Sequence, residues 1–377
     1  MNAIEPLSLC SRGRRVPLAS LVFGILLSFG SSIGSAEGAE AAPLRVEATS
    51  TTLDWNAVAQ AAGRIFVSGP RWTGFPGPSV ALLEPGNRLR AFPDRAWNDW
   101  RPGLDARRKF VNVNALHVDG EGKLWVIDTG TPQFGGPPVK GGAKLIRFDA
   151  RTGALLRVYP LGSGLAPAGS YIDDIRFNGA HAYLTDAGTG ALLVLDVASG
   201  DCRRVLVGHP AVMARADRPI IMDGKTLRDD RGTALRINVD PLEVSPDGKT
   251  LYFGPLEGPW SQVPTEALDD PSLPSEALAA RVTPWADLPP IGGSTMDHEG
   301  RLYFTALKDN TVYRREPDGR IVALLSDPRL HWADAPTLTA EGRLWLPVAQ
   351  LDRLAQFNHG KSTIRAPFSL LSMKVSR

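Results

Sequence analysis

Nine polar side chains stand beside apolar, strand-like segments of the chain, where they could meet a ligand. Some come just before such a segment and others just after one; they are Arg71, Asn114, Asp128, Thr129, Asp174, Asp186, Asp240, Asp334 and Gln350. Aspartates attract cations, while amide, hydroxyl and guanidinium groups orient a small molecule through hydrogen bonds. The sequence lacks a Gly-x-Ser-x-Gly elbow, a His-Glu-x-x-His motif, a P-loop and a dinucleotide fingerprint. The first interpretation is therefore that these residues bind a ligand.

The elements that must position these side chains recur along the chain. Each unit is an apolar strand, a tight turn that ends in Gly, and a second strand that carries an aromatic residue. Five units are clear and a sixth is degenerate; they are Leu116–Asp128, Ile175–Asp186, Val244–Phe253, Met296–Thr305, Leu338–Leu346 and Ala62–Ser68. Repetition at this scale is typical of a ring or a solenoid of identical modules.

The spacing of the units predicts an all-β fold, a six-bladed β-propeller. The aromatic markers stand 42 to 69 residues apart, and a four-stranded blade needs about 40 to 50 residues. We expect one domain over residues 37–377, with an insertion at 256–290 that carries two short helices. Because a ring must hide its edge strands, Leu44–Thr49 or Ile364–Leu370 should complete the last blade.

Propeller geometry predicts where chemistry can occur. The innermost strand of each blade starts at one mouth of the central channel, and the second strand returns to that mouth. The acids of the intervening turns then lie at the opposite face and serve the turns; they are Asp119, Asp247, Glu299 and Glu341. The nine polar residues named above would converge on one mouth, which is the usual form of a binding site. The ligand is expected to be small; the aspartates favour a cation, whereas Arg71 favours an anion.

The first 36 residues resemble a cleavable export signal. Arg14 and Arg15 precede an apolar run from Leu18 to Phe29, which is too short to span a bilayer, and small residues follow. Removing 1–36 leaves 39 basic and 39 acidic residues, so the mature chain lacks the charge of a nucleic-acid binder. Only Cys202 remains, which excludes an internal disulfide. We expect a secreted or periplasmic monomer with no membrane span after cleavage.

Several ordered motifs resemble the yellow/major royal jelly protein family, in its bacterial exported branch. The matching text includes Arg64–Trp72, Val113–Asp119, Leu124–Gly130, Tyr171–Phe177, Tyr183–Gly188, Ser245–Phe253 and Leu302–Leu307. The resemblance runs from about Val46 to Gln350 and implies a secreted six-bladed propeller. Members are associated with pigment metabolism or with binding small amines and other ligands in the channel, and no shared enzymatic activity is established.

The sequence departs from that family at channel positions. The family's Asp-Gly-Ile-Ala is replaced by Asp240–Glu243, a second Asp-Gly is replaced by Gly292–Gly293, and its Asn before Gln350 is Ala349. A more distant resemblance to gluconolactonase-type propellers implies a hydrolase with a divalent ion such as Ca²⁺. The catalytic Asp of that family falls on Pro255, which offers no side-chain oxygen. This hydrolase is one alternative, and a protein-interaction propeller that uses 256–290 is another.

Overall fold

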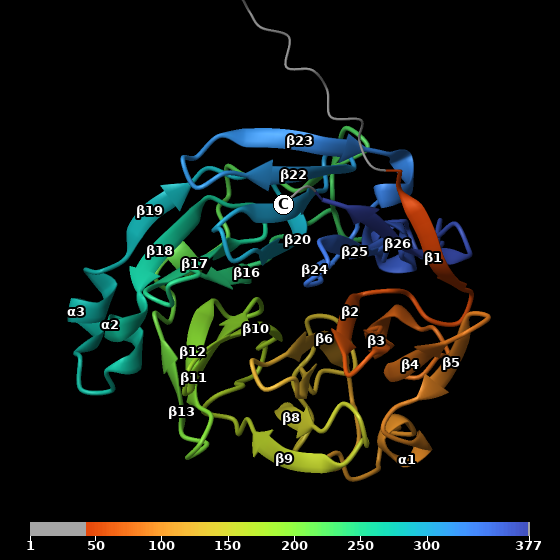
Figure 1. Ribbon diagram of the computed structural model, residues 1–377, viewed down its shortest axis with the longest axis horizontal. Helices are drawn as coiled ribbons and strands as arrows, with labels where there is room; N and C mark the ends of the chain where they lie inside the picture. The colour runs from red at the N-terminus through yellow and green to blue at the C-terminus, as the bar shows by residue number, and fades with distance from the viewer. Residues whose placement is uncertain (1–42, 376–377) are drawn as a thin grey trace, which may run out of the picture. The chain divides into compact units, whose positions relative to one another are not determined.

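The computed structural model describes residues 43–375, and within them six four-stranded antiparallel sheets form a ring (Figure 1). The prediction of a six-bladed β-propeller is confirmed. Consecutive innermost strands contact one another all the way round. The proposed signal segment 1–36 lies outside the described residues. No helix among the described residues is long and apolar enough to cross a membrane.

The first three blades run outward from the centre of the ring in chain order. The first contains β2 (Ala57–Ala61), β3 (Arg64–Ser68), β4 (Val80–Glu84) and β5 (Arg88–Ala91). The second contains β6 (Val113–Val118), β7 (Leu124–Asp128), β8 (Lys144–Phe148) and β9 (Leu155–Pro160). The third contains β10 (Ile172–Asn178), β11 (His181–Asp186), β12 (Ala191–Asp196) and β13 (Cys202–Val205).

The last three blades repeat this order, and the sixth closes the ring. The fourth contains β16 (Val239–Val244), β17 (Thr250–Pro255), β18 (Trp260–Pro264) and β19 (Thr283–Ala286). The fifth contains β20 (Ile291–Met296), β21 (Leu302–Ala306), β22 (Thr311–Arg315) and β23 (Ile321–Ser326). The sixth contains β24 (Thr337–Leu338), β25 (Arg343–Pro347), β26 (Phe368–Lys374) and β1 (Arg45–Ser50). Both segments expected to complete the last blade are used, because β26 pairs with β1.

The core lies between neighbouring blades and is built by the aromatic markers. Trp125 of β7 is fully buried and packs against Phe177 of the next blade at 4.9 Å between ring centroids. Apolar side chains from the facing surfaces of these two blades complete the same cluster. Such packing removes large aromatic areas from water and fixes one blade against the next.

The acidic turns behave as the sequence predicts. In the β6–β7 turn, the Asp119 carboxylate accepts backbone N–H groups from Glu121 and Lys123, and Gly122 adopts φ +73°. The same carboxylate accepts the Trp125 indole N–H at 2.8 Å. The Asp119 carboxylate therefore stabilises its own turn.

The segments between strands differ from expectation in one place. Residues 256–290 contain β18 and β19, so only their middle part, with α2 (Thr265–Asp269) and α3 (Ser275–Ala279), lies outside the sheet. The longest excursion among the described residues is instead 206–238, with η2 (Pro210–Val212), β14 (Ile221–Met222) and β15 (Lys225–Thr226). The remaining short helices are η1 (Arg71–Thr73), α1 (Arg95–Asn98), η3 (Pro328–Leu330), η4 (Leu351–Arg353) and η5 (Ala355–Phe357).

Candidate functional site

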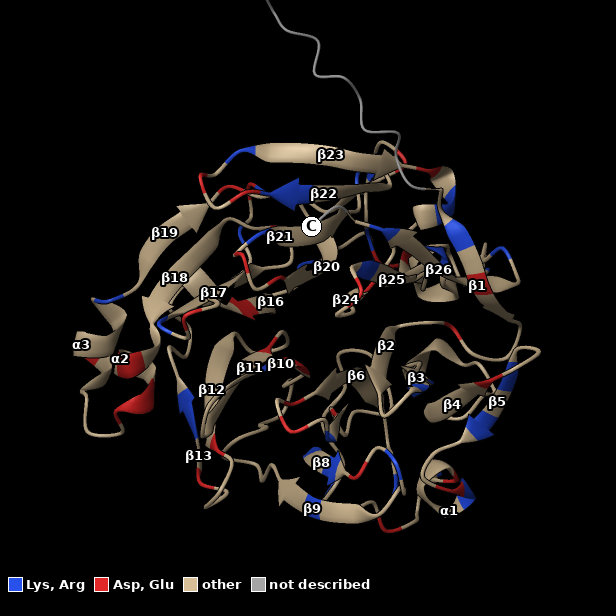
Figure 2. Ribbon diagram, in the orientation of Figure 1, with Lys and Arg blue, Asp and Glu red and all other residues tan. Residues whose placement is uncertain are grey.

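A cavity of about 360 Å³ opens at the face where innermost strands begin and second strands end. Each blade contributes one residue at its start; they are Asn56, Asn114, Asp173, Asp240, Gly292 and Asp334. Acidic segments of β10 and β16 lie beside the centre of the ring (Figure 2). We call this space the inner cavity. Its volume is at the lower end of the roughly 300–1,000 Å³ that small-molecule sites occupy.

Five of these six residues occupy one equivalent position in their blades. In each blade, a residue at the start of the innermost segment pairs with a residue at the end of the second strand, and the cavity residue comes next in the chain after the first of these. The pairs are Val113 with Asp128, Ile172 with Asp186, Val239 with Pro255, Ile291 with Ala306 and Ala333 with Val348. In blades two to five a register shift follows directly. Such a bulge re-aims side chains, and here it brings the equivalent residue to the axis.

Asp173 and Asp240 come from adjacent blades, and their carboxyl groups hydrogen-bond to each other. Burial raises the pKa of Asp240 to about 7, and burial together with the charge of Asp240 raises the pKa of Asp173 well above its usual value. One proton is therefore shared between two groups that cannot both ionise cheaply. Across the cavity, burial and the charge of Asp240 also raise the pKa of Asp334.

A chain of hydrogen bonds positions the acid pair from one side. The Trp72 indole donates to the Tyr171 hydroxyl at 2.9 Å, and that hydroxyl donates to the Asn114 side-chain oxygen at 2.8 Å. The Asn114 amide nitrogen then donates to the Asp173 carboxylate. Asn56 donates to the backbone carbonyl of Asn114 at 3.0 Å. Because each side chain in this series hydrogen-bonds to the next, the network fixes the orientation of the Asp173 side chain.

Aromatic rings form the walls of the inner cavity. Phe134, from the loop between β7 and β8, lies 4.9 Å from Trp72 and 6.4 Å from Phe357 of η5 between ring centroids. Trp332 lines the opposite part and donates its indole N–H to Asp334 at 3.1 Å. The site thus combines acids at the ring position with large apolar surfaces.

The structure brings Asn114, Asp240 and Asp334 together in the inner cavity, and it places Asp174 elsewhere. The Asp174 carboxylate pairs with Arg176 at 2.6 Å, and Arg176 also binds Glu243 at 2.8 Å. Its neighbour Asp173 takes the cavity position instead. Aligning Asn114, Asp173 and Asp240 as the second residue of each unit would have identified it from the sequence.

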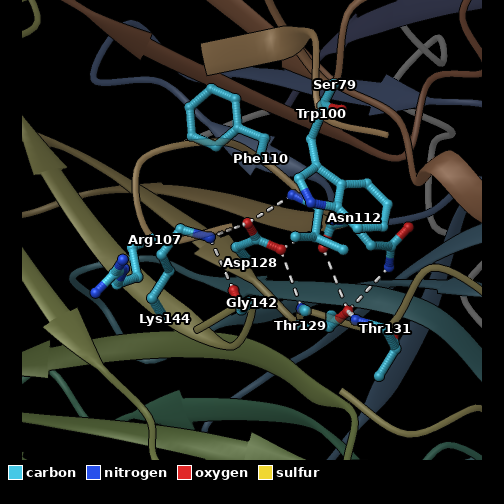
Figure 3. A network of polar contacts seen from close by, with 12 residues as sticks. Ser79, Trp100, Arg107, Phe110, Asn112, Asp128, Thr129, Thr131, Gly142 and Lys144 are labelled. Carbon is cyan, nitrogen blue, oxygen red and sulfur yellow. Dashed lines mark hydrogen bonds and ion pairs between the residues drawn. The ribbon is translucent and has the colours of Figure 1, made fainter. Parts of the chain in front are cut away.

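Asp128 and Asp186 lie outside the inner cavity and are fully buried. Asp128 accepts the backbone N–H groups of Val111 and Asn112, both at 2.9 Å, and pairs with Lys144 at 2.6 Å (Figure 3). Asp186 similarly accepts the Tyr171 N–H and pairs with Arg204 at 2.7 Å. Both carboxylates cap the loop that leads into the innermost strand of their own blade.

Thr129, Gln350 and Arg71 also lie outside the inner cavity. Thr129 belongs to the network around Asp128, where its hydroxyl accepts the Asn112 amide N–H at 3.0 Å (Figure 3). Gln350 accepts the backbone N–H of Arg365 and donates to its carbonyl, both at 3.0 Å. The Arg71 guanidinium donates to backbone carbonyls, with the shortest bond to Val111 at 2.8 Å. Each of the three groups is used in holding loops together.

Within residues 43–375 no group of three or more His, Cys, Asp or Glu side chains is arranged to hold a metal ion. Sequence reasoning also missed several lining residues from long loops, above all Phe134, Arg236 and Phe357. No local signal marks them, because loop residues reach the mouth only through the path of the folded chain.

A family model described as "Major royal jelly protein" matches residues 111–356. No curated protein sequence matches the chain. Similar solved structures include a gluconolactonase from Xanthomonas campestris, with 14% identity, a TM-score of 0.52 and coverage of 88% of this chain and 90% of that one. The calcium-binding protein regucalcin from Agrobacterium tumefaciens has 15% identity, a TM-score of 0.51 and coverage of 88% and 93%. Virginiamycin B lyase from Staphylococcus aureus has 12% identity, a TM-score of 0.50 and coverage of 88% of this chain and 99% of that one. Identities this low show a common fold alone.

Proposed function

We propose that this chain, which belongs to the major royal jelly protein family, binds a small organic cation in its inner cavity. One observation carries the proposal. Asp173, Asp240 and Asp334 face a single cavity, and among the described residues none of the three forms an ion pair with Lys, Arg or His. Carboxyl groups enclosed without a positive partner are costly to ionise, so a cation that enters the cavity gains strongly from them.

The walls favour an organic cation with an aromatic body. Trp72, Phe134 and Trp332 offer ring faces, and Phe357 closes the outer part. A cation over an aromatic face is attracted by about 0.5–2 kcal/mol, and the apolar part of the ligand gains from leaving water. A compact inorganic ion would use the acids and leave these surfaces without a partner.

Calorimetry with two matched compounds tests this function. Tyramine carries an ammonium group, and 4-ethylphenol has the same ring without it. We expect tyramine to bind and 4-ethylphenol to bind at least tenfold more weakly, since only the amine meets the acids. The variant Asp217→Asn, whose carboxylate pairs with Arg215 on the surface, should bind as the wild type does. Equal binding of both compounds, or binding of neither, would contradict the proposal.

The lactonase-type hydrolase is tested by metal-dependent stability and by lactone turnover. Thermal unfolding of chelated protein is followed after addition of Ca²⁺, since a ligand at 100 times its Kd adds about 2.7 kcal/mol of stability. Pro255 occupies the register position that Asp128 and Asp186 hold in their blades, and its side chain supplies no oxygen there. A stabilisation by Ca²⁺ together with lactone turnover would favour the hydrolase over the binding protein.

Export is the second part of the proposed function. The basic stretch, apolar run and small residues of 1–36 support it. Expression of the full chain in a bacterial host with cell fractionation should place the protein outside the cytoplasm. Its mature N-terminus should then lie close to residue 37, and a full-length chain kept in the cytoplasm would contradict export.

A further inference from the structure

Arg236 brings a positive charge to the acidic cavity. It lies in the long segment 206–238, just before β16, and it is the one Lys or Arg among the described residues that line the inner cavity. Its guanidinium makes no hydrogen bond or ion pair within residues 43–375, and the side chain is exposed. An arginine carries five donors in a planar fork, so this group is available to a ligand.

Other arginines near this face are already occupied. Arg204 pairs with Asp186 at 2.7 Å, and Arg218 donates to the carbonyls of Glu257 and Leu288, both at 2.8 Å. Glu257 is buried and lies within electrostatic reach of Arg236, yet the two form no ion pair. Unlike Arg204 and Arg218, Arg236 therefore has a guanidinium that binds no other part of the fold within residues 43–375.

The position of Arg236 joins two spaces. A wider outer chamber of about 730 Å³ adjoins the inner cavity, and both are lined by Phe134, Leu235, Arg236 and Phe357. Arg236 stands four residues before Asp240, so their α-carbons are at most about 14 Å apart. One small ligand can therefore contact the acids with one group and the guanidinium with another.

We propose that the ligand of the inner cavity is an aromatic zwitterion, with an ammonium group held by Asp173 and Asp240 and a carboxylate held by Arg236. This inference rests on the proposed function and adds the second charge to it. A guanidinium and a carboxylate form two parallel charge-assisted hydrogen bonds, which a simple amine cannot offer. Arg236 is thus a specificity-determining residue that separates amino acids from the corresponding amines.

Three compounds on one phenylethylamine frame test the inference by calorimetry. Tyramine has no carboxylate, tyrosine has one beside the ammonium, and 4-(2-aminoethyl)benzoic acid has one at the far end. We expect at least one zwitterion to bind about tenfold or more tightly than tyramine. In Arg236→Gln the ratio of zwitterion affinity to tyramine affinity should fall to about one.

The matched control is Arg231→Gln, which changes an exposed arginine that lines the outer chamber alone. It should preserve the preference for the zwitterion. Because the Arg236 side chain contacts no structural partner, Arg236→Gln should keep the melting temperature of the wild type. The inference is overturned if tyramine binds as tightly as both zwitterions, or if the preference survives in Arg236→Gln. In either case the amine-binding function stands. If none of the three compounds binds, the proposed function fails as well.

Discussion

Two pairs of aspartates in neighbouring blades, one fully buried and one half-buried at the inner cavity, have opposite surroundings. Asp128 and Asp186 end second strands, accept backbone N–H groups and each pair with a cation, Lys144 or Arg204. Asp173 and Asp240 lie at the start of innermost strands, each one residue after the residue that pairs with the end of the second strand. They face each other, and among the described residues no cation pairs with either carboxyl group.

The difference shows how to separate structural from functional acids. An acid with a paired cation and capped N–H groups has its charge satisfied by the fold, and removing either partner leaves a buried charge alone. An acid that faces other acids and has no cation beside it has no opposite charge within the fold, so the missing partner is expected to come from outside.

The largest expected effect tests the structural pair. Lys144→Met removes the cation of a pair in which both side chains are essentially inaccessible, at 1% and 0% exposure. Breaking such a pair costs about 3–5 kcal/mol of the free energy of unfolding. Urea denaturation should show this loss. Lys123→Met is the control, since its pair with Asp149 is partly exposed and contributes only about 0–1 kcal/mol. Similar small losses in both variants would erase the distinction.

The next effect concerns the cavity pair. Asp240→Asn should weaken tyramine binding by roughly 10- to 150-fold, the equivalent of losing one charged hydrogen bond of about 1.5–3 kcal/mol. The free energy of unfolding should stay the same or rise, because a repelling charge is removed from Asp173 and Asp334. Calorimetry and urea denaturation on one preparation measure both quantities. A variant that loses stability and keeps its affinity would place Asp240 with the structural acids.

Per pH unit, a smaller effect appears in the pH dependence of stability. The pKa of Asp240 is raised to about 7 in the folded chain, against about 3.9 when unfolded. Between these values the folded state retains a proton that the unfolded state has released. Stability therefore falls as pH rises from about 4 to 7, by up to ~1.4 kcal/mol per pH unit for one group, and then levels off.

Urea denaturation from pH 4 to 8 measures that slope, which Asp240→Asn should reduce. Asp54 is the control group, because burial raises its pKa to about 8 away from the inner cavity. Asp54→Asn should also flatten the slope and leave tyramine binding intact. Binding itself should strengthen as pH rises through 7, since the ionised carboxyl attracts the amine. A slope that neither variant alters would show that these acids do not titrate as proposed.

The smallest effect is expected at Gln350. Its side chain holds the backbone of Arg365 and lies outside the inner cavity. Gln350→Asn shortens that side chain while keeping a residue type that tolerates its left-handed backbone, φ +53°. Tyramine affinity should change less than twofold, with a loss of about 1 kcal/mol in stability. A large loss of affinity would bring Gln350 into the site.

Much of the fold and part of the site could be predicted from the sequence. The strand–turn–strand units correspond to the first two strands of each blade, and Asn114, Asp240 and Asp334 reach the expected mouth. These inferences succeed because strand period, turn residues and repeat phase are local properties of the chain. The helix signals of 256–290 predict an insertion there, whereas the longest segment between blades among the described residues is 206–238.

The sequence by itself determined the ring of six blades and the two alternative segments that could close it, and it predicted the mouth that Asn114, Asp240 and Asp334 line. Only the tertiary structure decided which acid of the Asp173–Asp174 pair turns to the axis, because a register shift between adjacent strands makes that choice. It also decided that Lys144 neutralises Asp128 and that Arg236 reaches the mouth. Such pairings join residues through the path of the whole chain, and no short pattern of residues encodes them.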